Sequence, residues 1–107
     1  MIINKNELDS DLVHDINYEL EALFESNRTW EISSDTGDLD NASNVQIVIK
    51  GKGSCYISTI SDTETYVWDL LNGYRKSQGL DTFCMSTSYF DPEKNGIVFD
   101  YADYISL

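Results

Sequence analysis

Basic residues are scarce in this chain. Of its 107 residues only seven are Lys or Arg, whereas 19 are Asp or Glu, which gives a formal net charge of −12. A surface with this charge repels nucleic acid and anionic membranes and favours basic partners. The nearest approach to a basic patch is the pair Lys50 and Lys52, and two lysines do not make a phosphate-binding surface. The composition therefore argues against direct binding of nucleic acid.

Histidine is scarcer still, which limits the catalytic chemistry open to the chain. The one histidine, His14, is expected on the acidic face of a helix, near Asp11 and Tyr18. Nucleophilic catalysis needs a base beside the nucleophile, and no nucleophile elbow or catalytic cysteine pattern accompanies His14. Carboxylate pairs are so common here that they indicate nothing about acid–base catalysis. We expect a protein that is not an enzyme.

The chain also has few cysteines, no secretory signal and no transmembrane run. Cys55 and Cys84 lie 29 residues apart, without the close Cys or His spacing of a zinc site. The N-terminal segment, residues 1–5, turns polar at once. These features predict a cytoplasmic protein with two free, buried thiols, in preference to a disulfide.

No cofactor motif is present, and the acidic loops fit a metal site poorly. Residues 91–96 have ligand types at positions one, three and five of a calcium-binding loop and Gly at position six, but position twelve would be Ala102 rather than Glu. Asp35, Asp38 and Asp40 lack the spacing of such a loop. No Gly-rich phosphate loop exists. We expect no cofactor and no metal, with a plain turn at residues 91–96.

The length and the hydrophobic content predict one folded domain, residues 1–107. Hydrophobic residues make up 41% of the chain and aromatic residues 12%, too much for a disordered acidic tail. The pattern predicts an α+β fold of order α-β-β-β-α-β-β, an antiparallel sheet with both helices on one face. The expected elements are a helix over 7–25, strands over 28–33, 45–50 and 54–60, a helix over 61–78, and strands over 82–90 and 97–105. Residues 51–53 should turn the second strand into the third, and a capping box at residues 61–64 should open the second helix.

The first predicted helix combines an ordinary apolar stripe with an unusual acidic face. Seven acids and no Lys or Arg occur from Glu7 to Glu25, and Asn6 is the expected N-cap. Acids four residues apart repel each other by roughly 0.2–0.5 kcal/mol per pair. Helix stability therefore does not explain this face. The apolar stripe is formed by Leu8, Leu12, Val13, Ile16, Leu20, Leu23 and Phe24.

The acidity is concentrated in the first part of the chain. Residues 1–44 hold eleven acids and two bases, a net of −9, whereas residues 45–107 hold eight and five, a net of −3. Tyrosine among carboxylates is typical of surfaces that bind a cationic protein. The candidate partner-binding residues are Glu7, Asp11, Tyr18, Glu21 and Glu25 on the helix, Asp35, Asp38 and Asp40 in the loop, and Asp100, Tyr101, Asp103 and Tyr104 near the end.

In size, acidity and α+β pattern the chain resembles bacterial toxin-immunity proteins, particularly those paired with contact-dependent growth-inhibition toxins and other polymorphic toxins. The segments that carry the resemblance are the 7–25 helix and the hairpins predicted over 45–60 and 82–105. The resemblance implies a cognate toxin domain, often a nuclease, bound in the cytoplasm. It assigns no individual residue.

Three functions are consistent with these residues. The first is an immunity protein that covers the basic active-site surface of a nuclease toxin. The second is a nucleic-acid mimic that inhibits a DNA- or RNA-binding enzyme. The third, an enzyme or metal-binding domain, would need a bound ion or a perturbed active-site group. The first is the expected function, because an acidic surface associates rapidly with a basic one and blocks its substrate.

Overall fold

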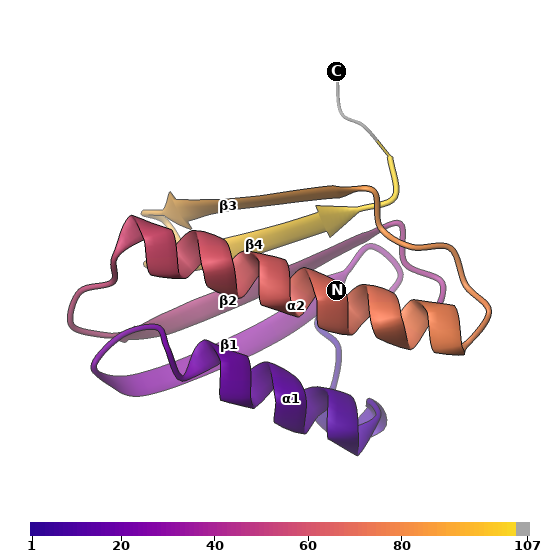
Figure 1. The fold of residues 1–107 in the computed structure, drawn as a ribbon, viewed down its shortest axis with the longest axis horizontal. Coiled ribbons are helices and arrows are strands. Elements are labelled where there is room, and N and C mark those ends of the chain that lie inside the picture. Colours follow the sequence, from indigo (N-terminus) through magenta and orange to yellow (C-terminus); the bar gives the residue numbers. More distant parts are fainter. Residues whose placement is uncertain (105–107) are drawn as a thin grey trace.

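The computed structural model, which describes residues 1–104, is a four-stranded antiparallel sheet with two α-helices against one face (Figure 1). The sheet order is β1-β2-β4-β3. The elements are a 3₁₀ turn Lys5–Glu7, α1 Ser10–Leu20, β1 Ser26–Ser34, β2 Asn44–Lys52, α2 Ile57–Ser77, β3 Met85–Asp91 and β4 Gly96–Ala102. This arrangement confirms the predicted α+β class, with both helices on one face of an antiparallel sheet.

The core lies between the sheet and the helices, and the strands alternate as their sequences predict. On β2, Val45, Ile47 and Ile49 are fully buried toward the helices, while the residues between them turn to the other face. From α1 and α2 the main core contributions are Leu12, Ile16, Leu20, Val67 and Leu71. The opposite face of the sheet carries no helix (Figure 1).

The first helix is shorter than predicted at both ends. Asp9, not Asn6, is its N-cap, because the Asp9 carboxylate accepts hydrogen bonds from the backbone N–H groups of Asp11 and Leu12. Glu7 belongs to the preceding 3₁₀ turn, and the α-helix ends at Leu20. The predicted apolar stripe beyond that point still enters the core, since Leu23 is fully buried in the turn that follows.

Tertiary contacts with the end of β2 account for this early helix end. The backbone N–H of Glu25 donates to the Lys52 carbonyl at 2.8 Å, and Phe24 adopts a positive φ of 62°. A Cβ on Gly51 would come within 2.6 Å of the Phe24 ring, so only glycine allows this approach. Gly51 and Gly53 therefore serve close packing, and the hairpin turn predicted at 51–53 is wrong.

The third predicted strand, 54–60, does not form. Its β-branched residues instead begin α2 at Ile57, with Tyr56 as an N-cap that has no side-chain hydrogen bond. The capping box predicted at 61–64 lies inside the helix, and Glu64 accepts a hydrogen bond from the Ser86 hydroxyl at 2.6 Å. Local β-propensity is a weak preference that tertiary packing overrides here.

The end of α2 is as predicted, whereas the strands that follow are shorter. Gly79 has φ 72° and closes the helix, with the N–H of Leu80 bonded to the Arg75 carbonyl. The strand predicted over 82–90 starts only at Met85, because both backbone groups of Phe83 are bonded to the Asn72 side chain. The last strand ends at Ala102, and position 105 of the prediction lies outside the described residues.

A buried arginine ties α2 to the two loops beside it. Arg75 is 4% exposed, and its guanidinium donates to the carbonyl oxygens of Leu39, Ala42 and Asp81. The guanidinium also lies 4.3 Å from the centre of the Phe83 ring. Carbonyl oxygens, rather than a carboxylate, therefore satisfy this cation and hold the 35–43 loop against the helix.

Replacing Arg75 with methionine is expected to destabilise the fold by roughly 3 kcal/mol, because hydrogen bonds to a charged group are lost and three carbonyls lose their donor. Urea unfolding measures the change. Lys76→Met, on the exposed neighbour, is the matched control and should cost less than about 0.5 kcal/mol. Equal stability of the two variants would contradict the role of Arg75.

Candidate protein-binding surface

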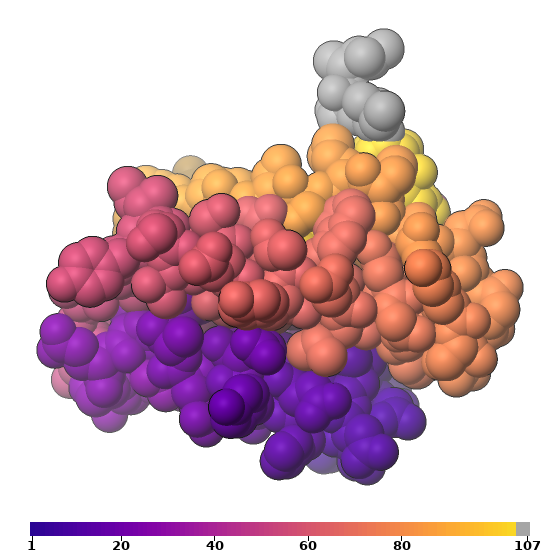
Figure 2. All heavy atoms as spheres, in the orientation of Figure 1, coloured from indigo at the N-terminus to yellow at the C-terminus, as the bar shows by residue number. Residues whose placement is uncertain are grey.

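The helix face of the molecule contains an acidic groove between α1 and α2. In Figure 2 the indigo side chains of α1 and the pink-to-orange side chains of α2 lie side by side across this face. A hollow of about 340 Å³ is lined by Asp9, Asp15 and Asp69 together with Leu70 and Tyr74. Three carboxylates from two helices thus face one depression. We call the residues lining this hollow, with those of the adjoining hollow described next, the acidic groove.

The groove continues into a second hollow where the 35–43 loop meets the 3₁₀ turn. This hollow, of about 200 Å³, is lined by Glu7, Asp38 and Asp40, and Tyr74 lines it as well. Tyr74 therefore lies at the junction of the two hollows. The arrangement brings the acids of the first helix region and of the loop, about 30 residues apart in sequence, onto one surface.

The junction is held by one short hydrogen bond. The hydroxyl of Tyr74 donates to Oδ1 of Asp40 at 2.6 Å. This bond raises the pKa of Tyr74 to about 12, with further contributions from partial burial and from the charges of Asp40 and Asp9. The phenol therefore stays protonated to a higher pH than an ordinary tyrosine, and its hydrogen bond fixes the loop to α2.

Two other acids of the loop are occupied by the loop's own structure. Asp35 accepts hydrogen bonds from the backbone N–H groups of Ser43 and Asn44. Asp38 accepts from the Thr36 hydroxyl and from Asn41, and these bonds lower the pKa of Asp38. Asp35 thus closes the loop, whereas Asp38, which is exposed, shapes the loop and still lines the groove.

Within residues 1–104 the carboxylates of the groove have no Lys or Arg partner. Across residues 1–104 the one contact between ionisable side chains of opposite type is His14 to Asp15, at 3.5 Å. Both arginines bond to backbone carbonyls instead, Arg28 to those of Leu23 and Phe24. Lys5 donates to the Trp30 carbonyl. The fold therefore uses several of its few cations internally and leaves the acidic surface uncompensated.

The predicted partner-binding residues are divided among several surfaces. Glu7, Asp38 and Asp40 line the acidic groove. Asp11 and Tyr18 form the rim of the groove, because Asp11 lies four residues before Asp15 on α1 and Tyr18 lies three residues after it. The side chain of Tyr18 is 67% exposed. The remaining exposed candidates, Glu21, Glu25, Asp103 and Tyr104, do not line it.

For the predicted residues on β4 the outcome is different. Tyr101 is fully buried, and its hydroxyl donates to the Glu64 carbonyl at 2.8 Å, so its assignment to an exposed surface is wrong. Burial raises the pKa of Tyr101. Asp100 accepts hydrogen bonds from Asn44 and Gln46 on the opposite face of the sheet. The alternation of a strand places the two neighbours on opposite faces.

Sequence reasoning missed four residues of this surface. Asp9, Asp69 and Tyr74 line the groove, and Tyr66, 52% exposed, lies one turn before Leu70 on the same side of α2. Asp15, one of the seven acids from Glu7 to Glu25, also lines the groove and is not among the predicted partner-binding residues. The acidic and aromatic residues Tyr66, Asp69 and Tyr74 within one predicted helix were the available signal, but only the packing of α2 beside α1 makes them part of one surface.

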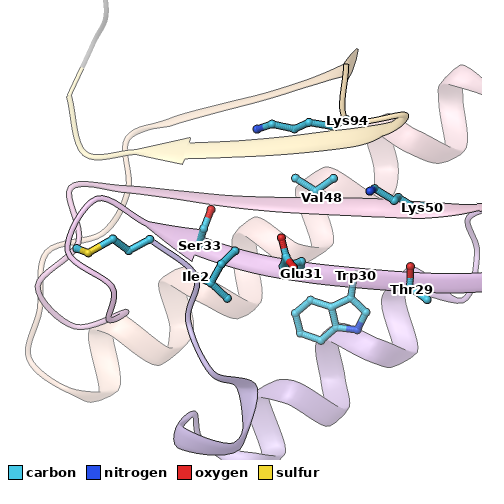
Figure 3. Close-up of a pocket in the computed structure, with 9 residues that line it drawn as sticks. Ile2, Thr29, Trp30, Glu31, Ser33, Val48, Lys50 and Lys94 are labelled. Atoms are coloured by element: carbon cyan, nitrogen blue, oxygen red, sulfur yellow. The ribbon is translucent and has the colours of Figure 1, made fainter. Parts of the chain in front are cut away.

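A larger hollow lies on the other face of the sheet. It measures about 550 Å³ and includes Glu31, Val48, Lys50 and Lys94, which Figure 3 shows projecting from the strands and the β3–β4 turn. Lys94 points along the sheet toward Gln46, at 3.5 Å. This face carries both lysines and acids, so it is neither uniformly acidic nor uniformly basic.

Within the described residues no group of three or more potential ligands could hold a metal ion. No helix among them is both long and apolar enough to span a bilayer. Cys55 and Cys84 are free thiols, as predicted, but Cys84 is exposed and Cys55 half-buried, so the expected burial is wrong. The Cys55 sulfur accepts a hydrogen bond from the Phe24 N–H at 3.1 Å.

Comparison with protein-family models, with curated proteins and with solved structures finds no match to this chain.

Asp40→Asn is expected to lower the pKa of Tyr74 from about 12 toward 10, because a neutral amide holds the phenolic proton less strongly than a carboxylate. Alkaline titration of tyrosinate absorbance measures the change, and Tyr74→Phe identifies the transition. The wild-type hydrogen bond contributes stability that is complete below pH 10 and is lost as the pH rises through about 12.

Asp103→Asn is the matched control, since Asp103 is exposed and does not line the groove. Its tyrosine titration should coincide with that of the wild type. If Asp40→Asn also left the tyrosine titration curve unchanged, the result would mean that the Tyr74–Asp40 hydrogen bond does not form in solution.

Proposed function

We propose that this protein is an immunity-type inhibitor that binds a cationic toxin domain through the acidic groove and its rim. The observation that carries the proposal is the uncompensated charge of the groove, since none of its carboxylates has a Lys or Arg partner in the described chain. Salt bridges that would stabilise the free protein are missing at the surface where a basic partner would supply them.

The geometry of the groove suits a protein partner. Asp9 and Asp15 beside α1 and Asp69 on α2 flank a shallow depression, and the exposed aromatic side chains of Tyr18 and Tyr66 lie near it. Tyrosine supplies contact area at the centre of many interfaces, and the surrounding charge accelerates association with a cationic partner.

A nuclease toxin is the partner class that we favour. Nuclease active sites are basic because they attract phosphate. An acidic protein that covers such a site excludes the substrate without any chemistry. The proposal places the protein in the bacterial cytoplasm, where the toxin must be neutralised.

The test is co-expression with the toxic domain encoded by the neighbouring gene. We expect this chain to restore growth and to bind the purified domain with an association rate that falls at least about tenfold from low to high salt. Failure to bind the neighbouring domain, or binding with a salt-independent rate, would overturn the proposal.

Neutralising the groove tests the site. The triple variant Asp11→Asn, Asp15→Asn, Asp69→Asn should slow association at low salt by about tenfold or more. The matched control changes the same charge elsewhere, with Glu21→Gln, Glu25→Gln and Glu93→Gln, and should slow it by less than about threefold. If the control variant slowed association more than the groove variant, the interface would instead lie at the C-terminal end of α1.

A further inference from the structure

The two edges of the sheet are protected unequally. The β1 edge is partly covered by the N-terminal segment, because Ile3 N–H donates to the Ile32 carbonyl at 2.8 Å and Ser34 N–H to the Met1 carbonyl at 2.9 Å. The β3 edge is open in Figure 1, with no helix or strand beyond it. Among residues 1–104, no hydrogen bond reaches the outer backbone of residues 86–90.

The open edge also lacks the features that normally prevent strand addition. Over residues 85–90 the strand contains no Lys, Arg, Asp, Glu or Pro, and its register with β4 runs without a shift; the charge of Asp91 and the ring of Pro92 lie only at its C-terminal end. Tyr89 and Phe90 are 44% and 59% exposed. Natural edge strands are usually interrupted by a charge, a proline or a bulge, because unpaired N–H and C=O groups otherwise recruit another strand.

The charge around this edge favours a cationic occupant. Residues 80–104 hold five acids, at 81, 91, 93, 100 and 103, against one base, Lys94, a net of −4. Asp91 is the last residue of β3, Glu93 lies in the turn that follows, and Glu64 contacts Ser86 from α2. A second copy of this chain would bring its own −12 charge to the same edge. A strand that carries Lys or Arg is therefore favoured over self-association.

We infer that the outer edge of β3 is a strand-addition site for an extended, Lys- or Arg-bearing segment of another polypeptide. Main-chain hydrogen bonds to residues 86–90 supply the affinity. Tyr89 and Phe90, on opposite faces of the strand, contact alternate side chains of the added segment. This site lies at the opposite end of the sheet from β1 and α1, and it does not depend on the proposed function.

The probe is a peptide of about nine residues with alternating Lys and Val, long enough to span the edge. We expect saturable binding, with amide hydrogen exchange slowed by about tenfold or more in β3 and unchanged in α1. The same peptide with alternate backbone amides N-methylated keeps its charge but cannot pair, and should bind about tenfold more weakly or not at all. A peptide of alternating Glu and Val should not bind.

Thr87→Lys and Thr29→Lys form a matched pair, since both threonines are exposed on edge strands and face away from the helices. Thr87→Lys should weaken binding by about fivefold or more through repulsion beside the added strand, whereas Thr29→Lys should change it by less than about twofold. Circular dichroism checks that both variants fold. The triple groove variant should keep peptide binding within about threefold, which separates this site from the groove.

Four outcomes would overturn the inference. Equal binding of the N-methylated peptide would mean that charge alone attracts the peptide. Exchange protection outside β3 would place the site elsewhere. Equal binding of the Glu–Val peptide would contradict the cationic occupant. A dimer in sedimentation that Thr87→Lys dissociates would mean that a second copy occupies the edge.

Discussion

The guanidinium of Arg75 is the interaction on which the arrangement of the acidic surface depends. From the last turn of α2 it donates to carbonyls in the 35–43 loop and in the segment before β3. It thereby fixes both loops to one helix without using a carboxylate. A planar group with five donors can satisfy several carbonyls at once, which lysine cannot do. Tyr74, one residue earlier on α2, then donates its hydrogen bond to Asp40 in a loop that Arg75 has already positioned.

This use of cations determines the electrostatics of the whole surface. The chain has seven Lys and Arg residues, and the two arginines are directed at backbone oxygens. The acids of α1 and of the groove consequently have no Lys or Arg partner among the described residues, at a cost in repulsion that the core must offset. The hydrophobic contacts that offset it come from both helices and three of the four strands. Such a surface is more favourable with a cationic macromolecule bound than in the free protein.

The sequence predicted the elements whose pattern is long and regular, and erred where distant segments meet. The alternation of residues 45–50 and the apolar stripe of α1 identified β2 and the first helix. The helix was extended too far because Leu23 and Phe24 continue the stripe, although contact with Gly51 bends the chain there. Residues 54–60 were assigned to a strand from β-propensity, which the packing of α2 overrides. Of the candidate surface, the acids on the first helix could be anticipated, but Asp69 and Tyr74 could not.

The sequence by itself determined the net charge, the scarcity of cations, the α+β class and the apolar faces, because these follow from composition and from the periods of helix and strand. Only the tertiary structure decided which acids share a surface. It placed Tyr101 in the core, directed Asp35 to the loop backbone, and brought Asp15 beside Asp69. It also left β3 rather than β1 as the open edge. Those outcomes depend on contacts between residues far apart in the chain, and no local pattern encodes them.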